Sequence, residues 1–185
     1  TKSGFKEVIN PSKIYLSSLS PDNSGTAITS IIEGNQVLML ELQALVSKTN
    51  FGYPKRTASG YDQKRLELLI AVLQSKLDLK LNMYDVYINL TGGFKVSDRA
   101  LDLAVAMAIY SSYENKKIIN SSVFFGEVGL SGEIRQIPKT KERIKEAVNL
   151  GFKNIVIPSF EKQIEVKGVN LNCIKDIKEL KQFLV

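Results

Sequence analysis

Two aliphatic, β-branched runs dominate residues 26–46, whose sequence is TAITSIIEGNQVLMLELQALV. Between the runs lie Gly34 and Asn35, residue types that adopt the positive φ angles of a tight two-residue turn. The pattern therefore predicts a β-hairpin of residues 26–33 and 37–46, and this hairpin defines the start of the fold.

Helices and strands are predicted to follow this hairpin. Residues 47–60 show no periodicity and predict a long exposed loop. Asp62 is expected to cap an amphipathic helix, Ser97 a second helix that is apolar nearly all round, and Thr140 a third. Further strands are expected at residues 85–90, 123–128, 133–137, 154–158 and 171–174, and a last helix at 176–184.

These elements predict an α/β (α+β) fold with a mixed sheet and packed helices. Residues 1–25 contain two prolines and a Ser-rich stretch that favour turns, so we expect them to form an N-terminal tether. Residues 26–185 are expected to form one domain, because a chain of 185 residues can bury a core without disulfides or a metal.

The composition excludes several classes of site. The chain has no His and a single Cys, so it cannot assemble a His-containing triad, a Cys-His dyad or a zinc site of His and Cys. No run approaches the roughly 18 apolar residues that span a bilayer, and the first residues lack the apolar core of a signal peptide. The sequence therefore predicts a cytoplasmic protein without membrane contact.

Nucleotide-binding motifs are absent from the sequence. Neither a G-x-x-x-x-G-K-[ST] phosphate loop nor a G-x-G-x-x-G fingerprint occurs, which predicts no autonomous ATP or NAD chemistry. Asp102 is the one acid within the apolar helix. It is expected to be either the structural partner of an arginine or a helix N-terminus, or an acid with a perturbed pKa.

Basic residues gather in the loop after the hairpin and in the following helix turn. The net charge of +6 is a weak signal for a polyanionic partner, but this local concentration, with Tyr53 and Tyr61 interleaved, suits phosphate contacts. The loop predicts binding of DNA, or of an acidic surface on a neighbouring subunit. The predicted DNA-binding residues are Lys48, Lys55, Arg56, Lys64 and Arg65.

A second basic run lies further along the chain. Lys139, Lys141, Arg143 and Lys145 are interspersed with glutamates, so this run is expected to form a solvated helix face.

The segment GEVGLSGEI at residues 126–134, with KER at 141–143 and IVIP at 155–158, resembles the proteolytic domain of Lon proteases. The resemblance covers about residues 26–160 and implies a Lon-like fold. In that family a Ser at the start of the buried helix and a Lys in the helix after the glycine-rich hairpin form a catalytic dyad.

Aligning these motifs without a gap puts Ala100 and Arg143 at the two dyad positions. Alanine has no nucleophilic atom, and arginine stays protonated near pH 7, so the dyad is degenerate. Ser97 and Lys141 lie close in sequence and are the candidates for a shifted dyad. No metal ligands are expected.

Three further motifs, ELQALV at 41–46, FGYPKRTA at 51–58 and GYD at 60–62, resemble the RadA (Sms) family of bacterial DNA-repair proteins. The resemblance implies a RecA-type ATPase joined to a C-terminal Lon-like domain, with this chain corresponding to the second part. It further implies that ATP, magnesium and zinc bind N-terminal to this chain. The implied assembly is a ring, usually a hexamer, on duplex or branched DNA.

The leading hypothesis is a non-enzymatic, DNA-binding and ring-forming module of a DNA-dependent repair ATPase. Its implied role is the processing of recombination intermediates and branch migration, with RecA as a further partner. The alternatives are a divergent Ser-Lys peptidase of the Lon type and a purely structural ring-forming domain.

Overall fold

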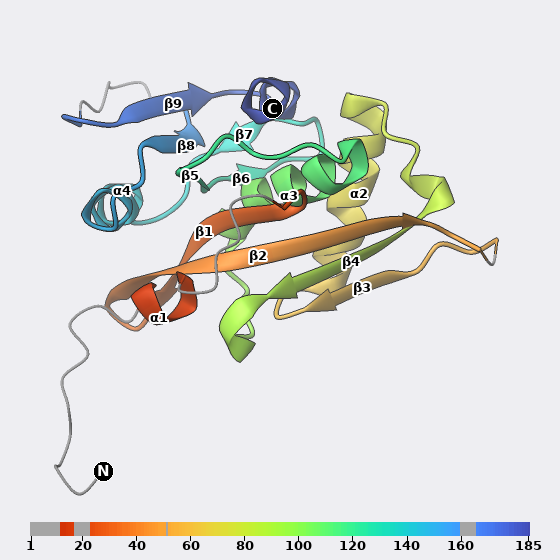
Figure 1. The fold of residues 1–185 in the computed structure, drawn as a ribbon, viewed down its shortest axis with the longest axis horizontal. Helices are drawn as coiled ribbons and strands as arrows, with labels where there is room; N and C mark the ends of the chain where they lie inside the picture. The colour runs from red at the N-terminus through yellow and green to blue at the C-terminus, as the bar shows by residue number, and fades with distance from the viewer. Residues whose placement is uncertain (1–11, 17–22, 51, 160–165) are drawn as a thin grey trace, which may run out of the picture.

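The computed structural model describes residues 12–16, 23–50, 52–159 and 166–185. Within these ranges the strands form three sheets (Figure 1). The largest has the order β1-β2-β4-β3, with β1 (Thr26–Glu33), β2 (Gln36–Lys48), β3 (Arg56–Ser59) and β4 (Tyr84–Leu90). The second, β5-β8-β9, contains β5 (Ser122–Phe124), β8 (Asn154–Pro158) and β9 (Asn170–Ile174). The third pairs β6 (Glu127–Val128) with β7 (Ile134–Arg135).

Helices and short helical turns connect these strands. The α-helices are α1 (Ser12–Leu16), α2 (Gln63–Leu77), α3 (Asp102–Glu114) and α4 (Thr140–Asn149). The 3-10 turns are η1 (Leu81–Met83), η2 (Thr91–Gly93), η3 (Arg99–Leu101) and η4 (Ile177–Phe183). Within the described ranges, every helix is too short or too polar to span a bilayer.

The predicted mixed α/β architecture is confirmed. In the largest sheet β1 pairs antiparallel with β2, β2 pairs antiparallel with β4, and β3 runs parallel to β4. The predicted hairpin is also present, with Glu33 opposite Gln36 and with Gly34 at a φ of 58°. Gly34 therefore acts as the sequence indicated, because Gly accepts a positive φ without steric cost. Asn35 does not have a positive φ, so the prediction is wrong at this second turn position.

Helix α3 lies at the centre of the molecule (Figure 1). All of its residues from Asp102 to Ser111 are buried, as its nearly uniform apolar character predicts. The apolar stripe of α2, which includes Leu66, Leu69 and Leu73, belongs to the same core cluster. Asp62 caps α2 as predicted, since its carboxylate accepts the backbone N–H of Arg65 at 2.8 Å.

The two larger sheets lie next to each other along β1 and β5, without ladder hydrogen bonds between these two strands. One core cluster packs β1, β2 and β4 against α2 and α3. The other packs the opposite faces of β1 and β2 against β5, β8 and α4. The strands therefore separate two hydrophobic layers, each covered by its own helices.

Several predicted boundaries differ from the structure. Residues 56–59, expected within a loop, form β3, because pairing with β4 supplies the order that their own sequence lacks. Asp98 rather than Ser97 caps the turn that leads into α3, by accepting the N–H of Ala100 at 2.9 Å. The last predicted helix is the 3-10 turn η4.

The expected tether also differs in part. Residues 1–11 and 17–22 lie outside the described residues, but Ser12–Leu16 form α1, which packs on β2. The Ser12 hydroxyl is buried and accepts the Met39 N–H at 3.1 Å. This part of the predicted tether is therefore packed into the domain.

Gly25 is expected to tolerate substitution much less than Gly34, although both have a positive φ. An added Cβ at Gly25 would lie 2.3 Å from the Ala44 carbonyl oxygen, whereas nothing lies within 4 Å at Gly34. Gly34→Ala should cost about 1 kcal/mol for the left-handed backbone alone. Gly25→Ala should cost at least about 2 kcal/mol more, measured by urea unfolding. Equal midpoints and slopes for the two variants would contradict the packing at Gly25.

Candidate functional site

Asp102 is fully buried at the start of α3 and joins three elements. Its Oδ1 accepts the Tyr61 hydroxyl at 2.6 Å. Its Oδ2 accepts Nε of Arg65 at 3.1 Å and the Val128 N–H at 3.2 Å, and it also forms an ion pair with Nη2 of Arg65. Nη2 of Arg65 also donates to the Val128 carbonyl. Asp102 is thus the structural partner of an arginine, one of the two roles considered from the sequence.

This cluster changes the proton affinities of two partners. Burial raises the pKa of the Tyr61 hydroxyl, and the charge and hydrogen bond of Asp102 raise it further. Burial lowers the pKa of the Arg65 guanidinium, but the hydrogen bond and charge of Asp102 outweigh burial and raise it. The hydroxyl therefore stays neutral and the guanidinium stays charged over the ordinary pH range.

A second buried arginine joins α4 to β1. Arg143 has no exposed side-chain surface, so the prediction that it lies on a solvated helix face is wrong. Its Nη1 donates to the Ser30 carbonyl at 2.7 Å and to the Ser30 hydroxyl at 3.0 Å. Its Nε donates to the Pro138 carbonyl at 3.1 Å, and Nη2 pairs with Asp98. The planar guanidinium satisfies all of these acceptors at once.

The two expected dyad positions are brought together through Asp98. One carboxylate oxygen of Asp98 accepts the Ala100 N–H and the other accepts Nη2 of Arg143. Ala100 itself is fully buried and has no reactive atom. The structure does not support a shifted dyad of Ser97 and Lys141 either. Both residues are exposed, whereas a lysine that acts as a base must be held neutral by burial.

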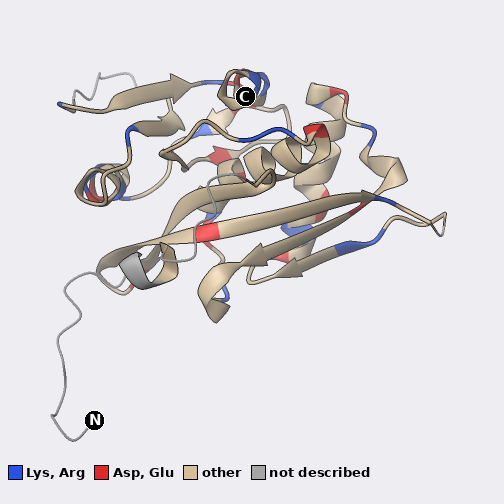
Figure 2. Ribbon diagram, in the orientation of Figure 1, with Lys and Arg blue, Asp and Glu red and all other residues tan. Residues whose placement is uncertain are grey.

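Three of the five predicted DNA-binding residues have exposed side chains: Lys48, Lys55 and Lys64. Lys48 ends β2, Lys55 precedes β3, and Lys64 lies in the first turn of α2. Basic residues at the end of β2 and the start of β3 lie at the same end of the sheet (Figure 2). Asp85 is also there: its carboxylate accepts the Lys55 N–H at 2.8 Å, and this bond is the main reason that its pKa is lowered.

The two arginines of the predicted set need correction. Arg65 is buried against Asp102, so its guanidinium cannot contact phosphate in this fold. Arg56 is half-buried, and it donates to the Leu81 carbonyl at 2.6 Å and to the Tyr84 carbonyl. Burial lowers its pKa, while the charges of Asp85 and Glu67 act in the opposite direction. Arg56 therefore holds η1 against β3 and presents little of its charge to solvent.

Of the two tyrosines within the basic segment, one is exposed and the other is buried. Tyr53 is 88% exposed, whereas Tyr61 is 8% exposed and belongs to the Asp102 cluster. Lys95 is an exposed basic residue that no sequence motif indicated, and it lines a pocket with Asp62 and Ser97. A single lysine between two apolar residues forms no recognisable pattern. Lys95 lies near Asp62 because the next residue, Val96, pairs with Tyr61.

No metal centre is evident in the part of the chain that the structure describes. Within those ranges no three His, Cys, Asp or Glu side chains gather closely enough to hold an ion.

Comparison with known families assigns the class of this chain. Residues 55–161 match the family described as subunit ChlI of Mg-chelatase. Because the match covers more than half of its length, the chain belongs to this family.

The individual relatives are DNA-repair proteins named RadA, which confirms the resemblance found in the sequence. The chain is 43% identical to RadA of Rickettsia felis over 96% of its own length, and 42% identical to RadA of Bacillus subtilis over 90%. It is 43% identical to RadA of Helicobacter pylori over 95%. It covers 40%, 38% and 39% of these three relatives, about two fifths of their length.

These matches correct the expectation that the chain is not an enzyme. The matched family is described as a subunit of Mg-chelatase, which is an enzyme, so membership of this family contradicts the expectation. The expectation rested on one degenerate dyad and on missing nucleotide motifs. The loss of one chemistry does not remove other activities, and backbone groups can bind phosphate without a recognised motif.

Asp102→Ala should strongly destabilise the chain, because it leaves the Arg65 charge buried without its partner. The expected loss is about 3–5 kcal/mol of unfolding free energy, measured by urea unfolding. Glu133→Ala is the matched control, since it removes a carboxylate whose partners, the Arg135 guanidinium and the Ser131 N–H, are exposed, and it should cost no more than about 1 kcal/mol. Equal losses in the two variants would contradict the structural role of Asp102.

The raised pKa of Tyr61 predicts a loss of stability in alkali. Above about pH 10 the unfolded chain releases this proton while the folded chain keeps it, so the unfolding free energy falls by about 1.4 kcal/mol per pH unit. Tyr61→Phe should remove this contribution, so its unfolding free energy should fall by about 1.4 kcal/mol less than that of the wild type between about pH 9 and pH 11, in urea melts. Tyr53→Phe should keep the wild-type slope, because solvent surrounds its hydroxyl. A wild-type slope in Tyr61→Phe would contradict the prediction.

Proposed function

We propose that this chain binds the DNA backbone as part of a DNA-repair protein. The observation that carries the proposal is the group of exposed side chains around β3, formed by Lys48, Lys55, Lys64 and Tyr53, in a chain related to RadA. Lysine neutralises phosphate charge, and an exposed tyrosine can stack on an unpaired base.

This surface would bind DNA with little sequence preference. Its positive charges are the ammonium groups of flexible lysine side chains, which contact phosphates as point charges and do not recognise base edges. Arg65 takes no part, because it is paired inside the protein. Asp85 and Asp62 offset part of the positive charge, so one copy of the chain would bind weakly. Several copies in one assembly would bind more tightly by raising the local concentration of sites.

We extend the proposal to the fold and to the assembly. The link from Ala100 through Asp98 to Arg143 supports a Lon-like domain, because it joins the two positions that a Lon dyad would occupy. The whole protein would form a hexameric ring on duplex or branched DNA and act in recombination and branch migration, with RecA as a partner. The relatives named as DNA-repair proteins support this role.

Replacing the three exposed lysines should weaken DNA binding by removing phosphate contacts. For Lys48→Ala/Lys55→Ala/Lys64→Ala, we expect at least a tenfold loss of affinity for a fluorescein-labelled duplex at about 50 mM salt, by anisotropy. The log-log salt slope should fall by up to about three units, one for each contact.

The matched control carries Lys139→Ala, immediately before α4, with Lys141→Ala and Lys145→Ala on α4, and has the same change in net charge. It should keep most of the affinity, because these lysines lie on another part of the surface. Equal losses in both triple variants would show that net charge alone governs binding. A loss of assembly at unchanged DNA affinity, seen by sedimentation, would favour a contact between subunits instead.

A further inference from the structure

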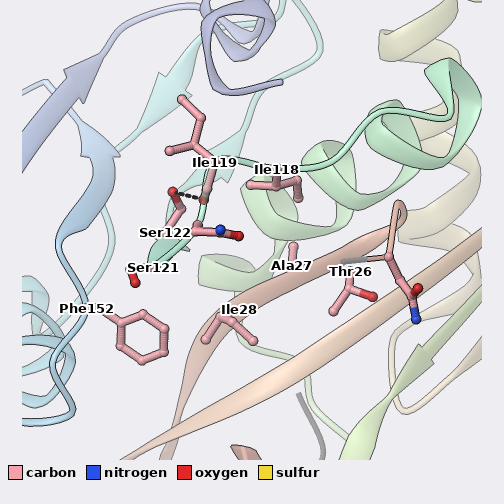
Figure 3. A pocket seen from close by; sticks show the side chains of 10 residues that line it. Thr26, Ala27, Ile28, Ile118, Ile119, Ser121, Ser122 and Phe152 are labelled. Atoms are coloured by element: carbon pink, nitrogen blue, oxygen red, sulfur yellow. Dashed lines mark hydrogen bonds between the residues drawn. The ribbon is translucent and has the colours of Figure 1, made fainter. Parts of the chain in front are cut away.

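A pocket of about 430 Å³ lies between the start of β1 and the segment that precedes β5, and Figure 3 shows it from close by. Its volume falls within the range of known ligand sites, about 300–1,000 Å³. The apolar part of its lining includes Ile28, Ile119 and Phe152. Ile28 and Phe152 belong to one hydrophobic cluster, so this wall of the pocket is part of the core. It suits the flat apolar body of an aromatic ligand.

Four polar side chains that line this pocket have no hydrogen-bond partner within the described residues. They are those of Asn23, Thr26, Asn120 and Ser121. The Ser122 hydroxyl differs from them, because it donates to the Ile119 carbonyl at 2.5 Å (Figure 3). Each amide carries two donors and an acceptor, and each hydroxyl can donate and accept. The pocket thus combines an apolar wall with free donors and acceptors.

The backbone at Asn120 and Ser121 is held firmly at the edge of the pocket. Ser121 has a φ of 57°, which residues other than glycine seldom adopt and which persists only where the surroundings fix it. Its carbonyl accepts the N–H groups of Lys153 and Asn154, each at 3.0 Å. The Asn120 carbonyl accepts Nδ2 of Asn154 at 3.0 Å. The two side chains are therefore presented from a backbone anchored at the start of β8.

The lining of the pocket carries no charge. None of its described residues is Lys, Arg, Asp or Glu, although these make up 24% of the chain. A charged group that entered the pocket would lose its hydration without gaining a partner. The pocket therefore suits an uncharged ligand.

A nucleobase combines the properties that this lining selects. It is flat, uncharged and apolar on both faces, and its edge carries donors and acceptors. A side-chain amide pairs with adenine through two hydrogen bonds, because its oxygen accepts from the N6 amino group and its NH₂ donates to N7. Asn120 can supply this pair, since its amide is free and its backbone is anchored.

We propose that this pocket binds adenine in the form of an uncharged nucleoside. The amide of Asn120 pairs with N6 and N7 of the base, which packs against Ile119 and Phe152. The hydroxyls of Thr26 and Ser121 are the partners for the hydroxyls of the sugar. The proposal goes beyond DNA binding and does not depend on it, because the pocket flanks β1 whereas the exposed lysines lie around β3, the opposite edge of the sheet.

The test is an NMR titration of the 15N-labelled full chain with adenosine. Saturable shifts should appear at the backbone amides of Asn23, Thr26, Asn120 and Ser121, with a dissociation constant of about 1 mM or lower. Purine riboside lacks the N6 amino group, so the Asn120 oxygen would lose its donor. This analogue should bind at least about tenfold more weakly than adenosine.

Variants separate this site from the rest of the surface. Asn120→Ala should weaken adenosine binding by at least about tenfold and remove the preference over purine riboside. Asn149→Ala is the matched control, because it removes an exposed asparagine at the end of α4 that does not line the pocket. It should bind adenosine as the wild type does. The Lys48→Ala/Lys55→Ala/Lys64→Ala variant should also keep full affinity for adenosine, so a failure of DNA binding would leave this result unchanged.

Three outcomes would overturn the proposal. Equal affinity of the wild type for adenosine and purine riboside would show that no amide recognises the edge of the base. Unchanged affinity in Asn120→Ala would place the ligand elsewhere, and so would shifts confined to residues outside the pocket at about 5 mM adenosine. If Asn120→Ala fails to fold, Ser121→Gly replaces it. Glycine accepts the φ of 57°, and loss of the hydroxyl should weaken adenosine binding by at least about threefold.

Discussion

The carboxylate of Asp102 is the interaction on which the arrangement of this domain depends. It is fully buried, and it joins α3 to α2 through Arg65, to the residues before α2 through Tyr61, and to β6 through Val128. A buried charge is tolerated when its partners satisfy it, and here both oxygens are bonded. The position of α2 on the central helix is thereby fixed, and so is the place of Val96, which pairs with Tyr61.

Burial also decides which basic residues are available to a ligand. In the sequence, Arg65 and Arg143 cannot be told apart from the neighbouring Lys64 and Lys141, because all four appear only as positive charges in basic runs. In the structure both arginines are internal, where five donors on a planar group can satisfy carboxylates and carbonyls together. Both lysines are exposed. The surface that can meet a polyanion is therefore built mainly from lysine.

Local signals predicted the parts of the fold that depend on local physics. The Gly34-Asn35 turn, the Asp62 cap and the apolar character of α3 identified the hairpin and two helices. Strand β3 escaped prediction because its order comes from pairing with β4, some 30 residues away. The basic segment of the candidate site could be read from the sequence, and Lys48, Lys55 and Lys64 are exposed in the structure. The burial of Arg65 and Tyr61 could not, because it depends on Asp102, which lies far along the chain. Contacts between residues that are far apart in the sequence produce no periodic pattern from which they could be predicted.

The contacts of Arg143 have a consequence for protein engineering. Its side chain satisfies Ser30, Pro138 and Asp98 simultaneously, and Asp98 also orders the turn that carries Ala100. Installing a serine at position 100 and a lysine at position 143 would therefore not recreate a working Ser-Lys pair. A lysine could not reach every acceptor, and the ion pair with Asp98 would keep its amine protonated. Reactivation would require redesign of the neighbouring residues as a set.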